Sequence, residues 1–203
     1  MKGKLLAIVF AFFALAMTAQ DAIKVDFKGA NPSITDLAWA FLKDASEYDE
    51  EECGDHPTDA VYNAMINNRD GIALDEGETL TIDEKNGYIV YEWVADSYVI
   101  RMEMCYWNEV DGKHKLFAFN NMASFYITDG RPIVTETSGM TFYRYNNATK
   151  KMTYCTPPGF TMEYSNVAYA LPRTGKDITI TKWHNDGTKT AKTLKWNGRR
   201  FGH

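Results

Sequence analysis

The sequence predicts an α+β protein in which antiparallel β-strands predominate, with two N-terminal helices followed by a long β-meander. Apolar residues recur at every third or fourth position up to about residue 70, and from Leu80 onward they recur at every second position. Turns rich in Gly, Asn and Asp separate the later segments, as hairpins require. Because a long meander leaves ladder groups unpaired unless it curls, we expect a barrel-like or sandwich sheet with the helices packed across one opening.

The two helices are predicted from capping residues and from helical spacing. Ser33, with Asp36 three residues later, forms a capping pattern in which a side-chain oxygen accepts a hydrogen bond from a free amide at the helix start. We expect one helix over residues 34–46 and a second over residues 58–68, after Pro57. Their expected buried faces comprise Ile34, Leu37, Ala38, Phe41 and Leu42 in the first helix and Val61, Ala64 and Met65 in the second.

The strands are predicted from alternating apolar residues and from the turns between them. A short strand over residues 21–28 precedes the helices, and the β-rich segment covers residues 79–201. Asn86-Gly87 supplies the positive φ of a hairpin turn. Residues 162–171 are expected to be extended. The strands expected in the meander are 79–83, 88–94, 98–108, 114–120, 123–128, 133–137, 141–145, 151–155, 177–184 and 191–196.

The first 19 residues have the pattern of a secretory signal peptide. Lys2 and Lys4 precede the apolar run LLAIVFAFFALAM, which small and polar residues follow. This run is shorter than the roughly 20 apolar residues of a membrane-spanning helix, and no later segment is apolar enough to cross a bilayer. We expect cleavage after Thr18 or Ala19. The remaining residues 20–203 then form a single globular domain, with a helical segment over 33–70, in the periplasm or outside the cell.

Composition and motifs disfavour several classes of function. The formal net charge of −5 gives no general attraction to nucleic-acid phosphates or to anionic lipids. The chain has no P-loop, dinucleotide-binding glycine pattern, zinc-peptidase motif, Cys-x-x-Cys pair or nucleophile elbow. We therefore expect no cofactor and no metal, and we assign no catalytic residue. The acidic segment EYDEEECGD (47–55) offers oxygen ligands for calcium but lacks the EF-hand spacing, so we expect a solvated loop.

The aromatic residues, 14% of the chain, suggest a binding site. Exposed Trp and Tyr rings can stack on sugar rings or on a peptide, although the same residues also dominate hydrophobic cores. In the strand over 98–108, Trp107 shares its face with Arg101 and Glu103, so we expect Trp107 to lie on the surface. We therefore select Trp107, Tyr106 and Arg101 as candidate ligand-binding residues.

Three cysteines follow the leader: Cys53, Cys105 and Cys155. An exported protein meets an oxidising compartment, where one disulfide can form. Cys105 and Cys155 both lie on the more polar faces of predicted strands, so a Cys105–Cys155 disulfide is allowed if these strands are neighbours. The alternative is three reduced thiols, each packed separately.

Several sequence blocks carry a resemblance that spans most of residues 80–201. They read NGYIVYEW, MCYWNEVDGKHKLFAFN, TFYRYNNATKKM, LPRTGKDI and LKWNGRRF, and PSITDLAWAFL extends the likeness to the N-terminal part. These blocks are similar to those of a family of small secreted proteins from Gram-negative bacteria that has no assigned activity. The resemblance implies an exported β-rich domain and brings no catalytic residues with it.

Two classes of function remain. The leading one is an exported, non-catalytic binding or interaction module of the bacterial envelope, with a protein or a glycan as its partner. The alternative is a carboxylate-dependent hydrolase acting on glycans or envelope polymers. For it, Glu92 and Glu103 lie among apolar neighbours, where burial would raise the pKa of a carboxyl group. A deep cleft with two converging acids would indicate the enzyme, and a shallow aromatic patch the binding module.

Overall fold

A computed structural model describes residues 22–49, 57–95, 98–126, 132–163, 166–184, 186 and 188–202. The predicted leader and most of the acidic loop therefore lie outside the described residues. Within them the chain forms two helices and eleven strands. In chain order these are β1 Ile23–Lys24, α1 Ile34–Asp49, α2 Pro57–Asp70, β2 Glu78–Asp83, β3 Tyr88–Val94, β4 Tyr98–Asn108, β5 His114–Tyr126, β6 Pro132–Asn146, β7 Lys151–Tyr154, β8 Val167–Ala170, β9 Ile178–Trp183, β10 Lys189–Trp196 and β11 Phe201–Gly202.

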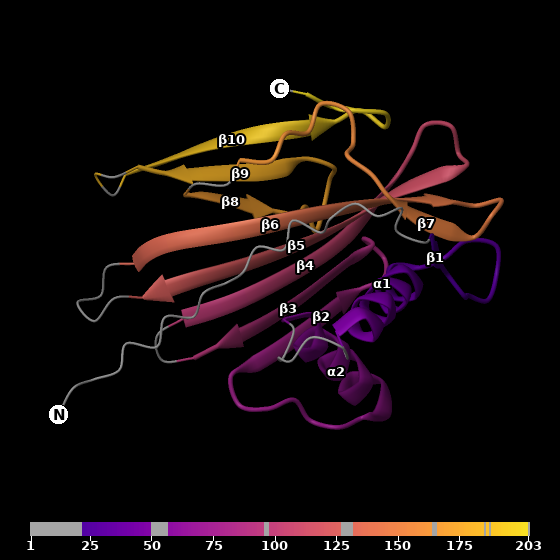
Figure 1. The fold of residues 1–203 in the computed structure, drawn as a ribbon, viewed down its shortest axis with the longest axis horizontal. Coiled ribbons are helices and arrows are strands. Elements are labelled where there is room, and N and C mark those ends of the chain that lie inside the picture. Colours follow the sequence, from indigo (N-terminus) through magenta and orange to yellow (C-terminus); the bar gives the residue numbers. More distant parts are fainter. Residues whose placement is uncertain are drawn as a thin grey trace.

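The two helices form where the capping residues and the apolar spacing predict them. The amide of Ser33 donates to Asp36 Oδ2 (2.8 Å), and the amide of Asp36 donates back to Ser33 Oγ (3.2 Å), so the capping pattern is confirmed. The predicted apolar faces of both helices are buried in one hydrophobic cluster. This cluster fixes α1 and α2 against one face of the sheet (Figure 1).

The sheet is mostly antiparallel and follows the order β11-β10-β9-β8-β6-β5-β4-β3-β2, with β7 paired to β6 and to β1. Neighbours in sequence are neighbours in the sheet from β2 to β6, which is the predicted meander. One parallel bridge, Thr137 to Val167, joins β6 to β8 and begins the C-terminal strands. No described ladder joins β2 to β11, so the sheet is not closed into a barrel in the part of the chain that the structure describes.

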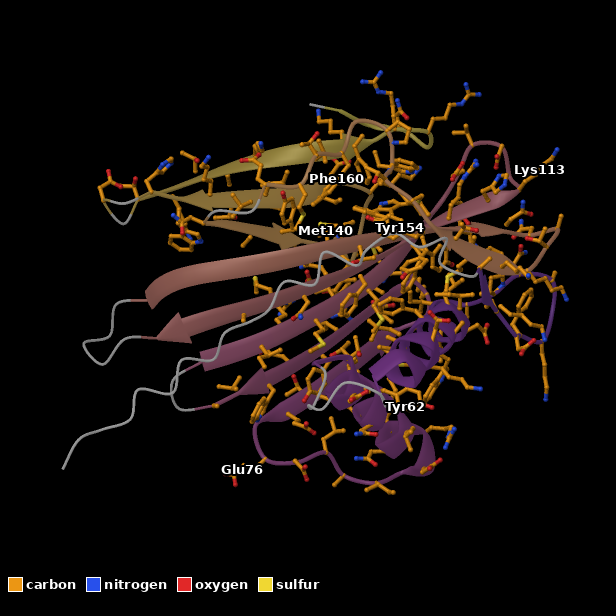
Figure 2. The ribbon with its side chains drawn as sticks, viewed as in Figure 1. Tyr62, Glu76, Lys113, Met140, Tyr154 and Phe160 are labelled. Atoms are coloured by element: carbon orange, nitrogen blue, oxygen red, sulfur yellow. The ribbon has the colours of Figure 1, made fainter. Side chains whose placement is uncertain are left out.

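The central strands have a hydrophobic core on each face because successive side chains point to opposite sides. On β4, Met102 and Met104 belong to the helix-side cluster, whereas Cys105 and Trp107 belong to a second cluster. The second cluster also contains buried residues of β8 to β11 and the loop residue Phe160. Phe160 lies on the side of these C-terminal strands and Tyr62 among the helices (Figure 2). We name the two clusters the helix-side core and the strand-side core.

Two pairs of predicted strands are single strands in the structure. Residues 114–120 and 123–126 form one strand, β5, and residues 133–137 and 141–145 both lie in β6. Asn121 pairs with Gly139 in the middle of these two strands. Asn and Gly have low β-propensity, so the sequence pattern weakens there, but the ladder of paired strands on both sides holds the backbone extended.

The strand order ends at β2 and at the two-residue strand β11, so most of β10 is an edge as well. β10 pairs with β9 along its whole length, but on its other side only Lys195 and Trp196 pair, with β11. Most of the first five residues of β10 are polar and all five are exposed. In the described residues, neither helix has the length and apolar character needed to cross a membrane.

We predict that Gly159→Ala destabilises the fold far more than Gly175→Ala. Both glycines have positive φ (80° and 87°), so an alanine would introduce the same backbone strain, about 1 kcal/mol, at either position. A Cβ at Gly159 would overlap the carbonyl oxygen of Phe201, whereas at Gly175 it would meet open space. The free energy of unfolding, measured by urea titration, should fall by about 2 kcal/mol more in Gly159→Ala. Equal losses in the two variants would contradict the packing of the C-terminus on this turn.

Candidate functional site

The three predicted ligand-binding residues do not form one site. Tyr106 and Trp107 are successive residues of β4 and therefore lie on opposite faces of the sheet. Arg101 shares the face of Trp107 but is six positions away, which corresponds to about 20 Å along an extended strand. Each of these residues therefore has a different environment.

Trp107 lies in the strand-side core, so the prediction that it is a surface residue is wrong. Its side chain is 4% exposed, and its ring contacts those of Trp196 and Phe201. The indole Nε1 donates to the carbonyl oxygen of Lys176 (2.9 Å). The C-terminal strands cover this face of β4 from Glu103 to Trp107, while Arg101 stays partly exposed beside them.

Arg101 lies between the carboxylates of Glu92 and Glu103. Its Nη1 donates to Glu92 Oε2 (2.9 Å), and its Nη2 and Nε donate to Glu103 Oε1 (3.2 and 3.3 Å). Burial opposes the charge on Arg101, but Glu103, Tyr88 and Glu92 together outweigh it, and the net result is a raised pKa of the guanidinium. The positive charge of Arg101 therefore stabilises both carboxylates, and they stabilise the guanidinium.

Glu103 is almost completely buried, at 2% exposure, and its remaining acceptor capacity is also used. Tyr88 donates its hydroxyl to Glu103 Oε1 (2.6 Å). Asn120 Nδ2 and the backbone amide of Leu171 each donate to Oε2 (3.0 Å). Burial, reinforced by Glu103, raises the pKa of Tyr88, which keeps its proton for this hydrogen bond. This set, which we call the Glu103 network, fits a structural role because every oxygen of the carboxylate is occupied.

A cluster of Glu109, Asp111 and His114 has donors suited to a metal, but an arginine already occupies it. Arg144 donates to both oxygens of Glu109 (2.5 and 2.6 Å), and Asp111 Oδ2 lies 2.6 Å from His114 Nδ1. Backbone and histidine hydrogen bonds lower the pKa of Asp111 to about 2. The guanidinium supplies the positive charge here, so we assign no metal to these residues.

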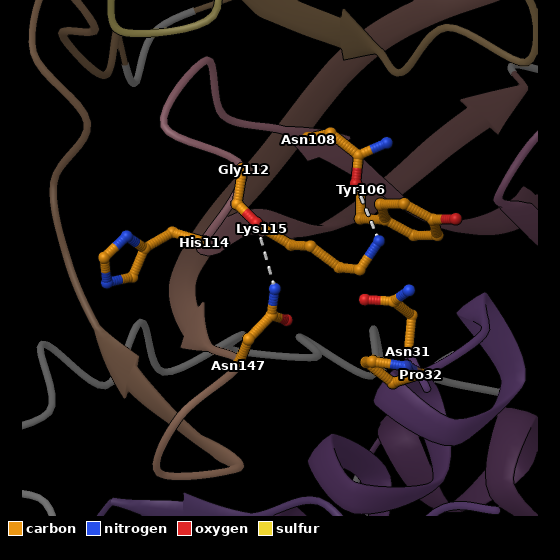
Figure 3. Close-up of a pocket in the computed structure, with 8 residues that line it drawn as sticks. All are labelled: Asn31, Pro32, Tyr106, Asn108, Gly112, His114, Lys115 and Asn147. Atoms are coloured by element: carbon orange, nitrogen blue, oxygen red, sulfur yellow. Dashed lines mark hydrogen bonds between the residues drawn. The ribbon is translucent and has the colours of Figure 1, made fainter. Parts of the chain in front are cut away.

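The described residues also form a cavity of about 440 Å³ at one end of the sheet. This volume falls in the range of small-molecule sites, roughly 300–1,000 Å³. The walls come from the loop before α1, from the ends of β4 and β5 and the turn between them, and from the turn after β6. The lining residues are Asn31, Pro32, Tyr106, Asn108, Gly112, His114, Lys115 and Asn147 (Figure 3).

Lys115 is the buried charge of this cavity, with only 6% of its surface exposed. Its Nζ donates to Asn108 Oδ1 (2.7 Å) and lies 4.2 Å from the centre of the Tyr106 ring. No carboxylate among the described residues forms an ion pair with it, and burial alone lowers its pKa. We call this space the Lys115 cavity.

Tyr106 contacts both Gly87 and Lys115. Its ring packs against Gly87 on one side, where an added Cβ would lie 2.8 Å from the ring, and Lys115 lies against the ring too. The positive φ of Gly87 (65°) confirms the predicted Asn86-Gly87 turn. Of the three predicted binding residues, only Tyr106 lines the cavity.

Asn147 contributes an unsatisfied acceptor. Its Nδ2 donates to the carbonyl oxygen of Gly112 (3.3 Å), but its buried Oδ1 accepts no hydrogen bond from the described residues. Figure 3 shows the side-chain ends of Asn31 and Lys115 pointing toward the same space, while the His114 ring points away. The cavity therefore offers the Lys115 ammonium and the exposed amide of Asn31 to one ligand, and the unsatisfied Asn147 oxygen lies buried in its wall.

The Cys105–Cys155 disulfide that the sequence allowed is not present, and both residues are free thiols. The strands are not neighbours, because β5 and β6 lie between β4 and β7 in the sheet. Both residues do point to the same face, since each contacts the strand-side core. Burial raises the pKa of both thiols, that of Cys155 to about 11.

Comparison of the chain with protein-family models, with curated proteins and with solved structures finds no match. The resemblance to a secreted family therefore stays a prediction, and the chemistry of the described residues is the basis for any function.

We predict that neither described thiol reacts rapidly in the folded protein. With a pKa of about 11, Cys155 is only about 0.1% thiolate at pH 8, so iodoacetamide should modify it about 100-fold more slowly than an unhindered cysteine. Peptide mass spectrometry after unfolding without reductant should find both residues alkylated. A Cys105–Cys155 linked peptide would contradict the structure.

We predict that Glu103→Gln lowers the free energy of unfolding by about 3 kcal/mol. The glutamine amide would place a donor among groups that already donate, and Arg101 would lose its buried partner. Glu92→Gln is the matched control: Glu92 is one-third exposed, and its loss should cost about 1 kcal/mol or less. Urea titration followed by tryptophan fluorescence measures both. Similar losses would show that the Glu103 network does not hold the fold.

Proposed function

We propose that this protein is an exported, non-catalytic binding module of the bacterial envelope and that its ligand site is the Lys115 cavity. The observation that carries the proposal is a cavity of ligand size lined both by Lys115, a buried lysine without a described carboxylate partner, and by Asn147, whose Oδ1 accepts no hydrogen bond from the described residues. Buried polar groups normally have partners, and those that lack one within the chain are candidates for contact with a ligand or with ordered water.

The proposed ligand is small and polar, such as the end of a glycan chain. The cavity walls present amide, ammonium and aromatic groups, which suit hydroxyl-bearing ligands better than apolar ligands. Export is supported by the signal-peptide pattern of residues 1–19. A partner protein at the same surface is a second form of the proposal.

The proposal includes a sandwich-like curl of the sheet. The contacts of Trp107 on β4 with Trp196 and Phe201 near the C-terminus support it, because these residues are distant in strand order and meet in one core. This curl covers the face opposite the helices and leaves the Lys115 cavity at the end of the sheet.

The alternative, a carboxylate-dependent hydrolase, has less support. Glu92 and Glu103 both bind Arg101, and neither lines the Lys115 cavity. Paired catalytic acids need access to a substrate and, for one of them, a proton to donate.

We predict that filling the cavity abolishes glycan binding. Asn31→Trp places an indole in the opening, and Asn31 is exposed, so the fold should tolerate it. Labelled protein on an array of bacterial glycans should bind a subset of them, and Asn31→Trp should reduce that binding at least about tenfold, the loss of one good contact.

Asn63→Trp is the matched control, because Asn63 is an exposed residue of α2 that does not line the cavity. It should bind as the wild type does. If the wild type binds no glycan, or if Asn31→Trp binds as well as Asn63→Trp, the cavity is not the glycan site.

A further inference from the structure

We propose that the ligand of the Lys115 cavity is an anionic sugar, one that carries a carboxylate or a phosphate together with free hydroxyl groups. This inference rests on the proposed function and adds the chemical class of the ligand. It is carried by the two groups of the cavity whose bonding capacity the described residues leave incomplete.

The first group is the Lys115 ammonium. An ammonium has three N–H donors, and one of them is used by Asn108 Oδ1 while the Tyr106 ring faces the charge. A buried charge is costly unless an opposite charge is near, and no described carboxylate pairs with Lys115. An anionic group in the cavity would supply the missing counter-charge and accept a charge-assisted hydrogen bond.

Other charged groups near the cavity do not take this role. His114 and Asp111 bind one another, and Asp111 and Glu109 both bind Arg144. Glu84 accepts hydrogen bonds from Ser33 and Thr35 at the start of α1. The acids around the opening therefore have partners of their own, and Lys115 is the cation left for a ligand.

The second group is Asn147 Oδ1, which is buried and accepts no hydrogen bond from the described residues. An acceptor needs a donor, and a bare carboxylate or phosphate has none when ionised. Because Oδ1 is buried, a ligand reaches it only when the Asn147 amide turns toward the cavity, and a ligand that then satisfies both groups carries an anionic oxygen for Lys115 and a hydroxyl for Asn147. Sugar acids and sugar phosphates have both, on rings that fit a space of about 440 Å³.

The expected effect of Lys115 on stability also fits a role in binding. Replacing a buried charge that lacks an opposite charge by an apolar side chain of similar length is often neutral or stabilising. We therefore expect Lys115→Met to fold and to be at least as stable as the wild type, since Asn108 is exposed and its oxygen can turn to water. A residue that lowers stability yet is needed for binding is typical of a ligand site.

The test is a titration of the purified protein with glucuronate, with glucose 6-phosphate and with glucose, followed in ¹H–¹⁵N spectra through the amides of Tyr106, Asn108 and Asn147. Glucuronate carries the carboxylate, glucose 6-phosphate carries the phosphate, and glucose is the neutral control. We expect at least one of the anionic sugars to bind about tenfold or more tightly than glucose, and the tighter of them identifies the source of the charge.

Two variants complete the experiment. Lys115→Met should bring the anionic sugars to the affinity of glucose. Lys113→Met, at an exposed position on the turn between β4 and β5, removes the same charge close by and should leave the preference unchanged (Figure 2).

Three results overturn the inference: glucose binds as tightly as the anionic sugars, Lys115→Met keeps the preference, or neither anionic sugar shifts the three amides at about 10 mM, ten times the Kd of a weak ligand. Its failure differs from that of the proposed function. If Asn31→Trp abolishes glycan binding while Lys115→Met does not, the cavity holds a neutral ligand and only this inference fails.

Discussion

The fold depends on one buried carboxylate, Glu103. Donors reach it from β3, β4 and β5 and from the backbone just after β8, and Asn120 also donates to the carbonyl oxygen of Tyr169 within β8. β8 joins β6 through a single described bridge, so side chains rather than the ladder fix the C-terminal strands over the meander. In a medium of low dielectric constant this arrangement is favourable only when every partner is present, which selects one position for β8.

Local chemistry made much of the fold predictable. The Ser33–Asp36 cap and the Asn86-Gly87 turn lie where the sequence places them, because each depends on residues only a few positions apart. The continuous strands β5 and β6 were not predictable, because Asn121 and Gly139 are extended only through their partners. The parallel bridge to β8 also lacks a local signal, since it joins residues that are far apart in sequence.

The site was predictable in part. Tyr106 was selected and does line the cavity. Trp107 was predicted to be exposed because it shares a strand face with Arg101 and Glu103, but it is buried. A strand of this length can pass from an accessible environment to a covered one. Lys115 was missed, although its position alternates with Phe117 and Phe119, which places a lysine on an apolar face. A charged residue on an otherwise apolar strand face is the sequence signal that would have indicated Lys115.

An open sheet has edge strands whose outer backbone groups are unpaired, and β10 is such a strand. Its outer backbone groups from residue 189 to 194 have no described partner strand, so a second molecule could add a strand there. Lys189 and Lys195 place charges along this strand, Lys192 adds one that Glu163 pairs (2.5 Å), and lysines on an edge strand oppose the approach of a second such strand. The exposed lysines of β10 therefore disfavour the addition of a second strand at this edge, and acetylation of their ammonium groups would remove that protection.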